Sequence, residues 1–127
     1  MEEKGTKPRF GIVNFERRRH PRFNIDLPIE YYAVDSSLGH SGQAINVSEG
    51  GLLVYLPEKV EMGQHLHLKL FFPSGSELNH VEMFAEAVWV DIHLGKAPGD
   101  YRSGLRFVQI SSDDLDKLKT FLRSLAE

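Results

Sequence analysis

The chain contains no cysteine, and this absence excludes several kinds of chemistry at once. Without thiols it cannot form disulfides, attack a substrate through a thiolate or bind zinc through sulfur. It also lacks any apolar run of about 20 residues, the length that a membrane-spanning helix needs. Its start lacks the apolar core of a signal peptide. We therefore expect a protein without a membrane span that works in the reducing cytoplasm.

An excess of positive charge is missing as well. Lys and Arg number 15 against 18 Asp and Glu, which leaves a net charge of −3. Broad, sequence-independent binding to long nucleic acid usually needs a basic face, so we expect no DNA partner. At 127 residues the chain has room for one domain with a single core. We expect a flexible lead-in over residues 1–15 and one folded domain over residues 16–127.

Alternation of apolar and polar residues dominates the body of the chain and predicts β-strands. In residues 25–31 every odd position is apolar. Pro28 cannot donate a hydrogen bond to a neighbouring strand, so it should lie at an edge or a bulge. Six short strands separated by turns of Gly, Pro and Ser favour a small closed antiparallel barrel. Besides residues 25–31, the expected strands are residues 41–47, 51–56, 65–70, 81–92 and 104–108, with a turn at residues 73–76.

The only helical pattern lies at the C-terminal end. Ser112 can cap a helix, and Asp113 and Asp114 suit the positive end of its dipole. Leucines at helical spacing predict one apolar stripe, formed by Leu115, Leu118, Leu122 and Leu125. We expect this helix to lie across the end or the side of the barrel.

Four arginines fall within residues 17–22, against an acidic background. A guanidinium group can hold a phosphate through two hydrogen bonds or stack on a base, so the cluster indicates a local anion site. The alternative is a basic patch that is merely solvated or faces a membrane. A second polar segment, residues 46–51, reads Asn-Val-Ser-Glu-Gly-Gly and precedes another expected strand. We interpret the two segments as halves of one site for a small anion.

Other polar residues give weaker indications. His65 and His67 share a strand face, but no third ligand is evident, so we expect them to face solvent and predict no metal site. Trp89 is interpreted as packing in the core or at the barrel rim. Ser48 lacks the Gly-x-Ser-x-Gly elbow of a nucleophile and has no recognisable histidine partner. We therefore predict a binding module and not an enzyme.

These segments together resemble the PilZ domain family. Residues 18–22 match its RxxxR motif, and residues 46–51 match its [D/N]xSxxG motif. Residues 104–107 are similar to the glycine–hydrophobic–x–Phe segment near the end of that fold, and the resemblance covers roughly residues 16–126. It implies a six-stranded antiparallel β-barrel with a C-terminal α-helix. It also implies a bacterial receptor for the second messenger cyclic di-GMP.

The resemblance also implies which residues hold the ligand. Arg18 and Arg22 would pair with a guanine edge or a phosphate, as arginine does when it reads guanine in DNA. The [D/N]xSxxG motif would supply a polar floor and a close backbone approach through Asn46, Ser48 and Gly51. Asn in place of Asp keeps the hydrogen bond but loses its charge assistance.

The residue before RxxxR bears on stoichiometry in this family, and here it is Arg17. An arginine at this place can stack on the guanine of a second ligand. The resemblance therefore implies two molecules of cyclic di-GMP, bound as an intercalated pair.

The resemblance implies no catalytic output, so the protein would signal in trans to an unidentified protein partner. Motility, polysaccharide and chemotaxis machinery all remain open as partners. Two other functions also remain open. One is a PilZ-fold adaptor that contacts proteins without binding a ligand. The other is a small barrel that binds single-stranded RNA, which would need exposed aromatic residues on its strands. The alternation here is expected to turn most aromatic residues inward.

Overall fold

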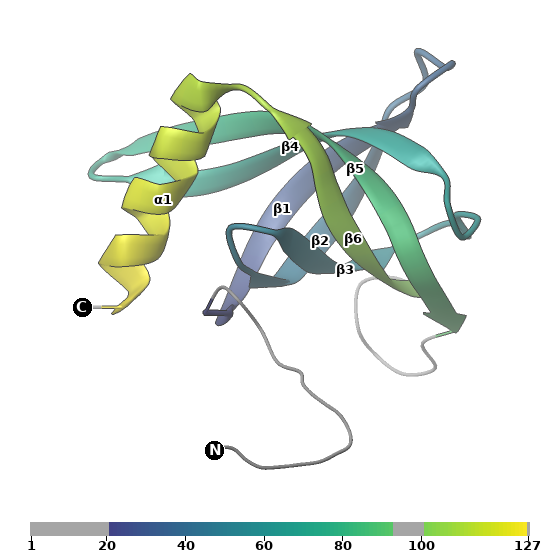
Figure 1. The fold of residues 1–127 in the computed structure, drawn as a ribbon, viewed down its shortest axis with the longest axis horizontal. Helices are drawn as coiled ribbons and strands as arrows, with labels where there is room; N and C mark the ends of the chain where they lie inside the picture. Colours follow the sequence, from purple (N-terminus) through teal and green to yellow (C-terminus); the bar gives the residue numbers. More distant parts are fainter. Residues whose placement is uncertain (1–20, 93–100, 127) are drawn as a thin grey trace, which may run out of the picture.

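The computed structural model describes residues 21–92 and 101–126. These residues form six strands followed by one helix (Figure 1). The elements are β1 Phe23–Ala33, β2 His40–Val47, β3 Gly51–Leu56, β4 His65–Ser74, β5 Glu77–Ile92, β6 Tyr101–Ile110 and α1 Ser112–Ala126. The expected lead-in over residues 1–15 lies outside the described residues.

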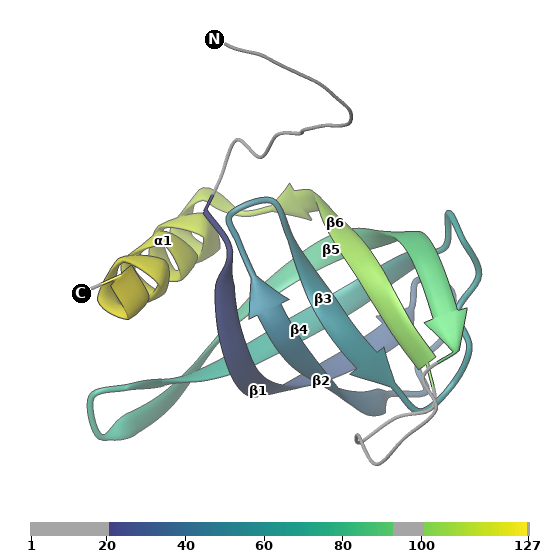
Figure 2. The same ribbon diagram turned by 90° about the horizontal axis from the view of Figure 1, so that it is seen from below.

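The strands form a closed barrel in the order β1-β2-β3-β6-β5-β4, and every neighbouring pair is antiparallel (Figure 2). β1 closes the ring because it pairs with β4 as well as with β2, beginning at Ile29 opposite Leu70. This architecture confirms the fold class predicted from the alternation. No helix in the described part of the chain is long and apolar enough to cross a membrane.

Pro28 lies on a part of β1 that has a strand neighbour on one side, so its missing N–H group leaves few hydrogen bonds unmade. It pairs with Gln43 of β2, whereas β1 pairs with β4 only from Ile29 onward. The register of β1 with β2 also shifts between Asn24 and Leu27. Pro28 therefore sits next to an irregularity, on a stretch with one strand neighbour, as a residue without a hydrogen-bond donor requires.

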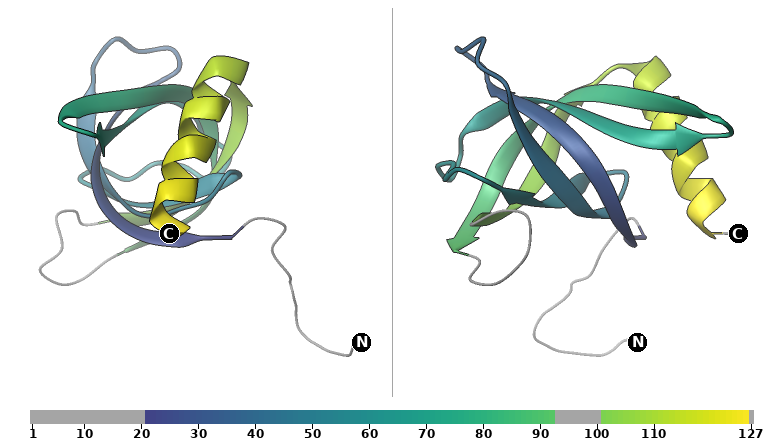
Figure 3. Two further views of the ribbon diagram at one scale, coloured as in Figure 1. Left: turned by 90° about the vertical axis from the view of Figure 1, so that its left-hand side faces the viewer. Right: turned by 180° about the vertical axis from the view of Figure 1, so that it is seen from behind.

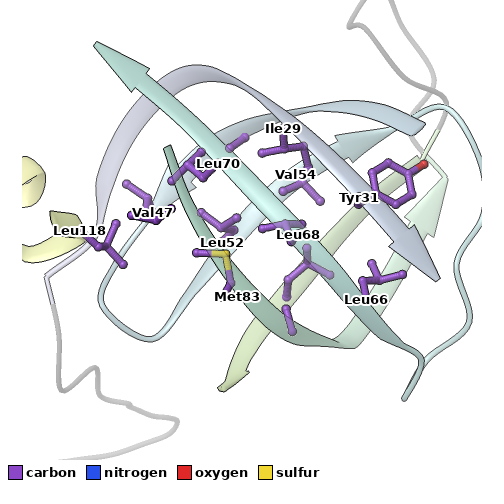
Figure 4. Packing of buried hydrophobic residues seen from close by; sticks show 14 of the residues in the cluster. Ile29, Tyr31, Val47, Leu52, Val54, Leu66, Leu68, Leu70, Met83 and Leu118 are labelled. Atoms are coloured by element: carbon purple, nitrogen blue, oxygen red, sulfur yellow. The ribbon is translucent and has the colours of Figure 1, made fainter. Parts of the chain in front are cut away.

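The core fills the barrel interior with alternate residues of each strand (Figure 4). In β4, for example, Leu66, Leu68 and Leu70 are buried while the residues between them face outward. Helix α1 crosses one end of the barrel (Figure 3). Its Leu118 is fully buried, and the ring of its Phe121 stacks on Phe72 with centroids 4.6 Å apart. The helix thus closes this end of the core against water.

Two details of the helix differ from the prediction. The cap is Ser111 and not Ser112, because the Ser111 hydroxyl accepts a hydrogen bond from the Asp114 N–H at 3.1 Å. The expected leucine stripe is also only partly right. Leu125 is exposed, and Phe121 takes the buried position beside Leu118. The buried face of the helix therefore includes Phe121, which is not one of the repeating leucines, and excludes Leu125.

The β4–β5 hairpin is longer than predicted. Pairing continues to Ser74 opposite Glu77, and Gly75 makes the turn with a positive φ of 62°. Residues 77–80 are mainly polar, so they gave no alternation to reveal a strand. In this outer part β4 and β5 pair only with each other, and the hairpin extends beyond the barrel over α1 (Figures 1 and 2).

Candidate ligand-binding site

An open cavity of about 370 Å³ lies at the start of β3, beside Arg22, where β3, β6 and β5 are neighbours. Both predicted motif segments contribute to it, because Arg22 comes from the arginine cluster and Ser48, Gly50 and Gly51 come from the second segment. None of the described residues that line it is acidic. The remaining lining residues are Leu52, Val88, Trp89, Gly104, Leu105 and Arg106.

A tight turn shapes the wall formed by Ser48. Its backbone N–H donates to the carbonyl of Gly51 at 3.0 Å, and its hydroxyl accepts from the N–H of Gly50, also at 3.0 Å. Only 3% of Ser48 is exposed. Because the hydroxyl oxygen acts as an acceptor inside the turn, its proton can still be donated into the cavity.

Two glycines line the cavity at places where a neighbouring group comes very close to the backbone. A Cβ atom added to Gly51 would lie 2.2 Å from the carbonyl oxygen of Leu105, and one added to Gly104 would lie 2.2 Å from Nε1 of Trp89. Neither place has room for a side chain. At Gly51 the space is taken by the backbone of the neighbouring strand β6, and at Gly104 by the indole of Trp89, as is common for an isolated glycine in a strand. The close approach of a ligand predicted at Gly51 stays a prediction.

Trp89 lines the cavity, which the sequence did not indicate. Its indole packs over Gly104 and is 38% exposed, so rim packing describes only part of its position. The hydroxyl of Ser103 donates to the Trp89 carbonyl at 2.8 Å, and the guanidinium carbon of Arg102 lies 5.7 Å from the ring centroid. The strand register puts Trp89 opposite Gly104, a residue without a side chain, and this pairing places the indole at the cavity. Knowledge of that register would be needed to predict the position of Trp89.

The structure brings Arg22 and Asn46 together, as predicted, but in a particular way. Nε of Arg22 donates to Oδ1 of Asn46 at 2.5 Å, and Nδ2 of Asn46 donates to Oδ1 of Asn24 at 3.3 Å. Asn46 therefore holds the guanidinium of Arg22 and does not itself line the cavity. The other two predicted arginines, Arg17 and Arg18, lie outside the described residues.

Arg106 is the second cation at the cavity, and sequence reasoning missed it. It lies opposite Glu86 in the β5–β6 register, and the two side chains form an ion pair. Arg106 occupies the variable position of the segment at residues 104–107, which does not indicate a role for it. Its place at the cavity depends on how three strands distant in sequence are paired. Two guanidinium groups without a carboxylate on the described lining make the cavity suitable for an anion.

The histidines belong to another part of the surface. Nε2 of His67 lies 3.1 Å from Oε1 of Glu82, and Nε2 of His80 lies 3.5 Å from Oε2 of the same carboxylate. The hydrogen bond from His67 is the main cause that lowers the pKa of Glu82. Within residues 21–92 and 101–126 no group of three side chains could hold a metal ion.

The expectation that aromatic residues point inward holds only in part. Tyr31 and Phe72 are buried, but Phe84 is exposed on the outer surface. There its ring stacks on His67 with centroids 5.0 Å apart. The ring of Tyr32, on the neighbouring strand β1, has its centroid 5.9 Å from that of His67. Strand alternation sends every second residue outward, and these residues occupy outward positions.

Comparison with known proteins supports the architecture. Residues 16–124 match the family model of the PilZ domain. No curated protein sequence matches the chain. Among solved structures, the Bacillus subtilis inhibitor of motility MotI/DgrA gives a TM-score of 0.71 at 19% identity. That match covers 89% of this chain and 53% of the other, so the chain spans about half of MotI/DgrA.

Two further structures are matched over nearly their full length. The PilZ domain of Escherichia coli YcgR, solved with c-di-GMP, gives a TM-score of 0.65 at 17% identity, covering 87% of this chain and 92% of that one. The PilZ domain of CeSA from a cellulose-synthesizing bacterium gives 0.58 at 15% identity, covering 84% and 99%. At these identities the likeness establishes the fold.

Proposed function

Because the chain belongs to the PilZ domain family, we propose that it is a receptor for cyclic di-GMP. The observation that carries the proposal is the cavity lined by Arg22, Ser48 and Gly51, which joins both family motifs in one place. A PilZ domain of similar fold was solved with this ligand bound, which supports the same ligand class here. The protein is a binding module in this proposal and not an enzyme.

The chemistry of the cavity suits this ligand. Cyclic di-GMP carries two phosphodiester anions and two guanines, whose O6 and N7 atoms accept hydrogen bonds. Arg22 supplies a planar donor for either group, and Ser48 supplies a hydroxyl proton. Gly51 lines the cavity without a side chain, so a flat ring could approach its backbone closely. Arg18 would provide the second guanidinium of the motif.

Asn46 acts in this proposal through Arg22. Its side-chain oxygen holds Nε of Arg22 and so fixes the plane in which the guanidinium presents its hydrogen bonds. An aspartate there would hold the arginine more strongly but would also neutralise part of its charge. The neutral amide holds the guanidinium without adding a negative charge beside it.

The proposed receptor works in the cytoplasm and signals in trans to a protein partner. The absence of cysteine is compatible with that compartment. One structure of similar fold is an inhibitor of motility, and another comes from a cellulose-synthesizing bacterium. Motility and polysaccharide machinery are therefore the first partners to test, followed by chemotaxis proteins.

Titration calorimetry with cyclic di-GMP tests the receptor assignment. We expect the unmodified protein to bind, and Arg22→Ala to lose about 2–5 kcal/mol of binding free energy, because a charge-paired anchor is removed. Arg123→Ala is the matched control, since Arg123 is an exposed helix residue that does not line the cavity. Cyclic di-AMP is the ligand control, because adenine carries an amino group where guanine has O6.

The other two functions give different results in the same experiment. If the protein binds neither a cyclic dinucleotide nor RNA, the result would favour the adaptor that works without a ligand. Salt-dependent binding of a single-stranded oligonucleotide, without preference for cyclic di-GMP, would favour the RNA-binding barrel. An Arg22→Ala variant that binds like the unmodified protein would show that the ligand lies elsewhere.

A further inference from the structure

The ion pair between Arg106 and Glu86 lies at the edge of the cavity. Arg106 on β6 is directly opposite Gly51 on β3 and directly opposite Glu86 on β5. Residues opposite each other in a sheet project from the same face. Because Gly51 has no side chain, the Arg106 side chain has no side chain opposite it on β3, and both residues line the cavity.

We propose that Arg106 is a further anion-binding residue of this cavity and that Glu86 competes with the ligand for it. The inference rests on the proposed function, because the ligand it requires is the one proposed above. It adds two residues that belong to neither sequence motif. Arg106 would pair with a phosphate or a guanine edge of the ligand, and Glu86 would occupy the same guanidinium while the cavity is empty.

The exposure of the Arg106 side chain makes such an exchange feasible. Arg106 is 59% exposed, so its guanidinium can turn from β5 toward the cavity without breaking core packing. The Glu86 side chain is 27% exposed, so the pair is partly open to solvent, and ion pairs that solvent can reach contribute only modestly to stability. A phosphate held by two guanidinium groups and a hydroxyl makes stronger, charge-assisted hydrogen bonds. The ligand can therefore displace Glu86 from Arg106.

Glu86 then has a defined effect on affinity. When Arg106 turns to the ligand, the carboxylate of Glu86 is left unpaired close to an anion. Both the broken ion pair and this repulsion oppose binding. Glu86 would thus raise the ligand concentration at which the receptor responds, without touching the ligand itself.

A second arginine–carboxylate pair on the same two strands provides the matched control. Arg102 of β6 pairs with Asp91 of β5 at 3.0 Å, opposite each other in the same register. Neither residue lines the cavity. Asp91→Asn and Glu86→Gln change the charge of β5 equally, so a difference between them reports on Arg106 and not on net charge.

The test is a double-mutant cycle measured by calorimetry with cyclic di-GMP. We expect Arg106→Ala to weaken binding by about tenfold and Glu86→Gln to tighten it about threefold. In the Arg106→Ala background Glu86→Gln should have little effect. Asp91→Asn should leave affinity nearly unchanged, as should Lys59→Ala, which removes a positive charge from an exposed loop away from the cavity.

The outcomes separate this inference from the receptor assignment. Failure of the unmodified protein to bind would remove both. Normal binding by Arg106→Ala, with the unmodified protein also binding, would overturn only the role of Arg106. Equal tightening by Glu86→Gln in both backgrounds would overturn the competition. If Arg106→Ala does not fold by circular dichroism, Arg106→Lys serves instead, because it keeps the charge and loses the planar pair of donors.

Discussion

At the scale of single residues, Tyr31 shows what burial does to a polar group. It is 2% exposed, and its hydroxyl has no hydrogen-bond partner among the described residues. Burial, with a smaller contribution from the charge of Glu58, raises the pKa of Tyr31 to about 12. The unfolded chain therefore loses this proton at lower pH than the folded one. Stability should fall as pH rises from about 10 toward 12.

Replacing Tyr31 with Phe tests that reasoning. The substitution removes a buried hydroxyl without a partner, so unfolding free energy at pH 7 should be unchanged or up to about 1 kcal/mol higher. Between pH 9 and pH 11 the variant should lose less stability than the unmodified protein, measured by urea unfolding at each pH. A parallel loss in both proteins would mean that Tyr31 does not titrate differently on folding.

The candidate site was predictable only where its residues lie close together in the sequence. Arg22, Ser48 and Gly51 belong to short segments whose composition indicates anion binding, and the structure brings them to one cavity. Trp89 and Arg106 become part of it through strand register. A one-residue change in pairing would turn them away, and the register includes irregularities between Ala87 and Trp89 that alternation does not reveal.

At the scale of elements, helix α1 completes the sheet as well as the core. β6 pairs with β5 only from Met83 onward, which leaves the backbone of the outer hairpin without a strand on that side. Side chains from the first turns of α1 form hydrogen bonds with this backbone instead. Oδ2 of Asp114 accepts a hydrogen bond from the N–H of Glu82 at 3.0 Å, and Nζ of Lys117 donates to the carbonyl of His80 at 3.3 Å. The helix is thereby fixed to the hairpin by hydrogen bonds as well as by packing.

Asp114→Ala should therefore destabilise the fold. It leaves the N–H of Glu82 without its acceptor, which typically costs about 1–3 kcal/mol. Asp113→Ala is the control, because Asp113 also lies in the first helical turn and differs in being exposed. It should lose only its interaction with the helix dipole, about 0.3–1 kcal/mol. Urea unfolding of both variants measures the difference, and equal losses would show that the bond to Glu82 adds nothing.

Element boundaries show why sequence patterns succeeded and failed. The sequence indicates a strand at residues 65–70 because one of their faces is buried and therefore strictly apolar. Residues 77–80 carry no such pattern, because the outer hairpin extends beyond the barrel and these residues are exposed or only partly buried. Ser111 and Ser112 are both able to cap a helix, and only the observed bond to Asp114 distinguishes them.

At the scale of the whole molecule, positive charge is concentrated at one end of the chain. The net charge is −3, and residues 1–20 contain six Lys or Arg against three Glu, so the remaining residues carry −6. An acidic barrel repels an anionic ligand at long range, and the arginine cluster is the part of the sequence that attracts it. Ligand binding should therefore weaken as salt concentration rises, because salt screens this attraction.

Charge balance also bears on how many ligands bind. Two molecules of cyclic di-GMP bring four negative charges, and residues 17–22 contain four arginines. One molecule would leave an excess of positive charge in the cluster, whereas an intercalated pair balances it and shields purine faces from water. We expect a calorimetric ratio of two ligands per chain, and Arg17→Leu should reduce it to one.

Arg19→Leu is the control for this prediction. It removes the same charge from the same segment but lies inside the RxxxR motif at a variable position, so it should weaken binding while leaving the ratio at two. A ratio near one for the unmodified protein would contradict the paired arrangement without affecting the receptor assignment.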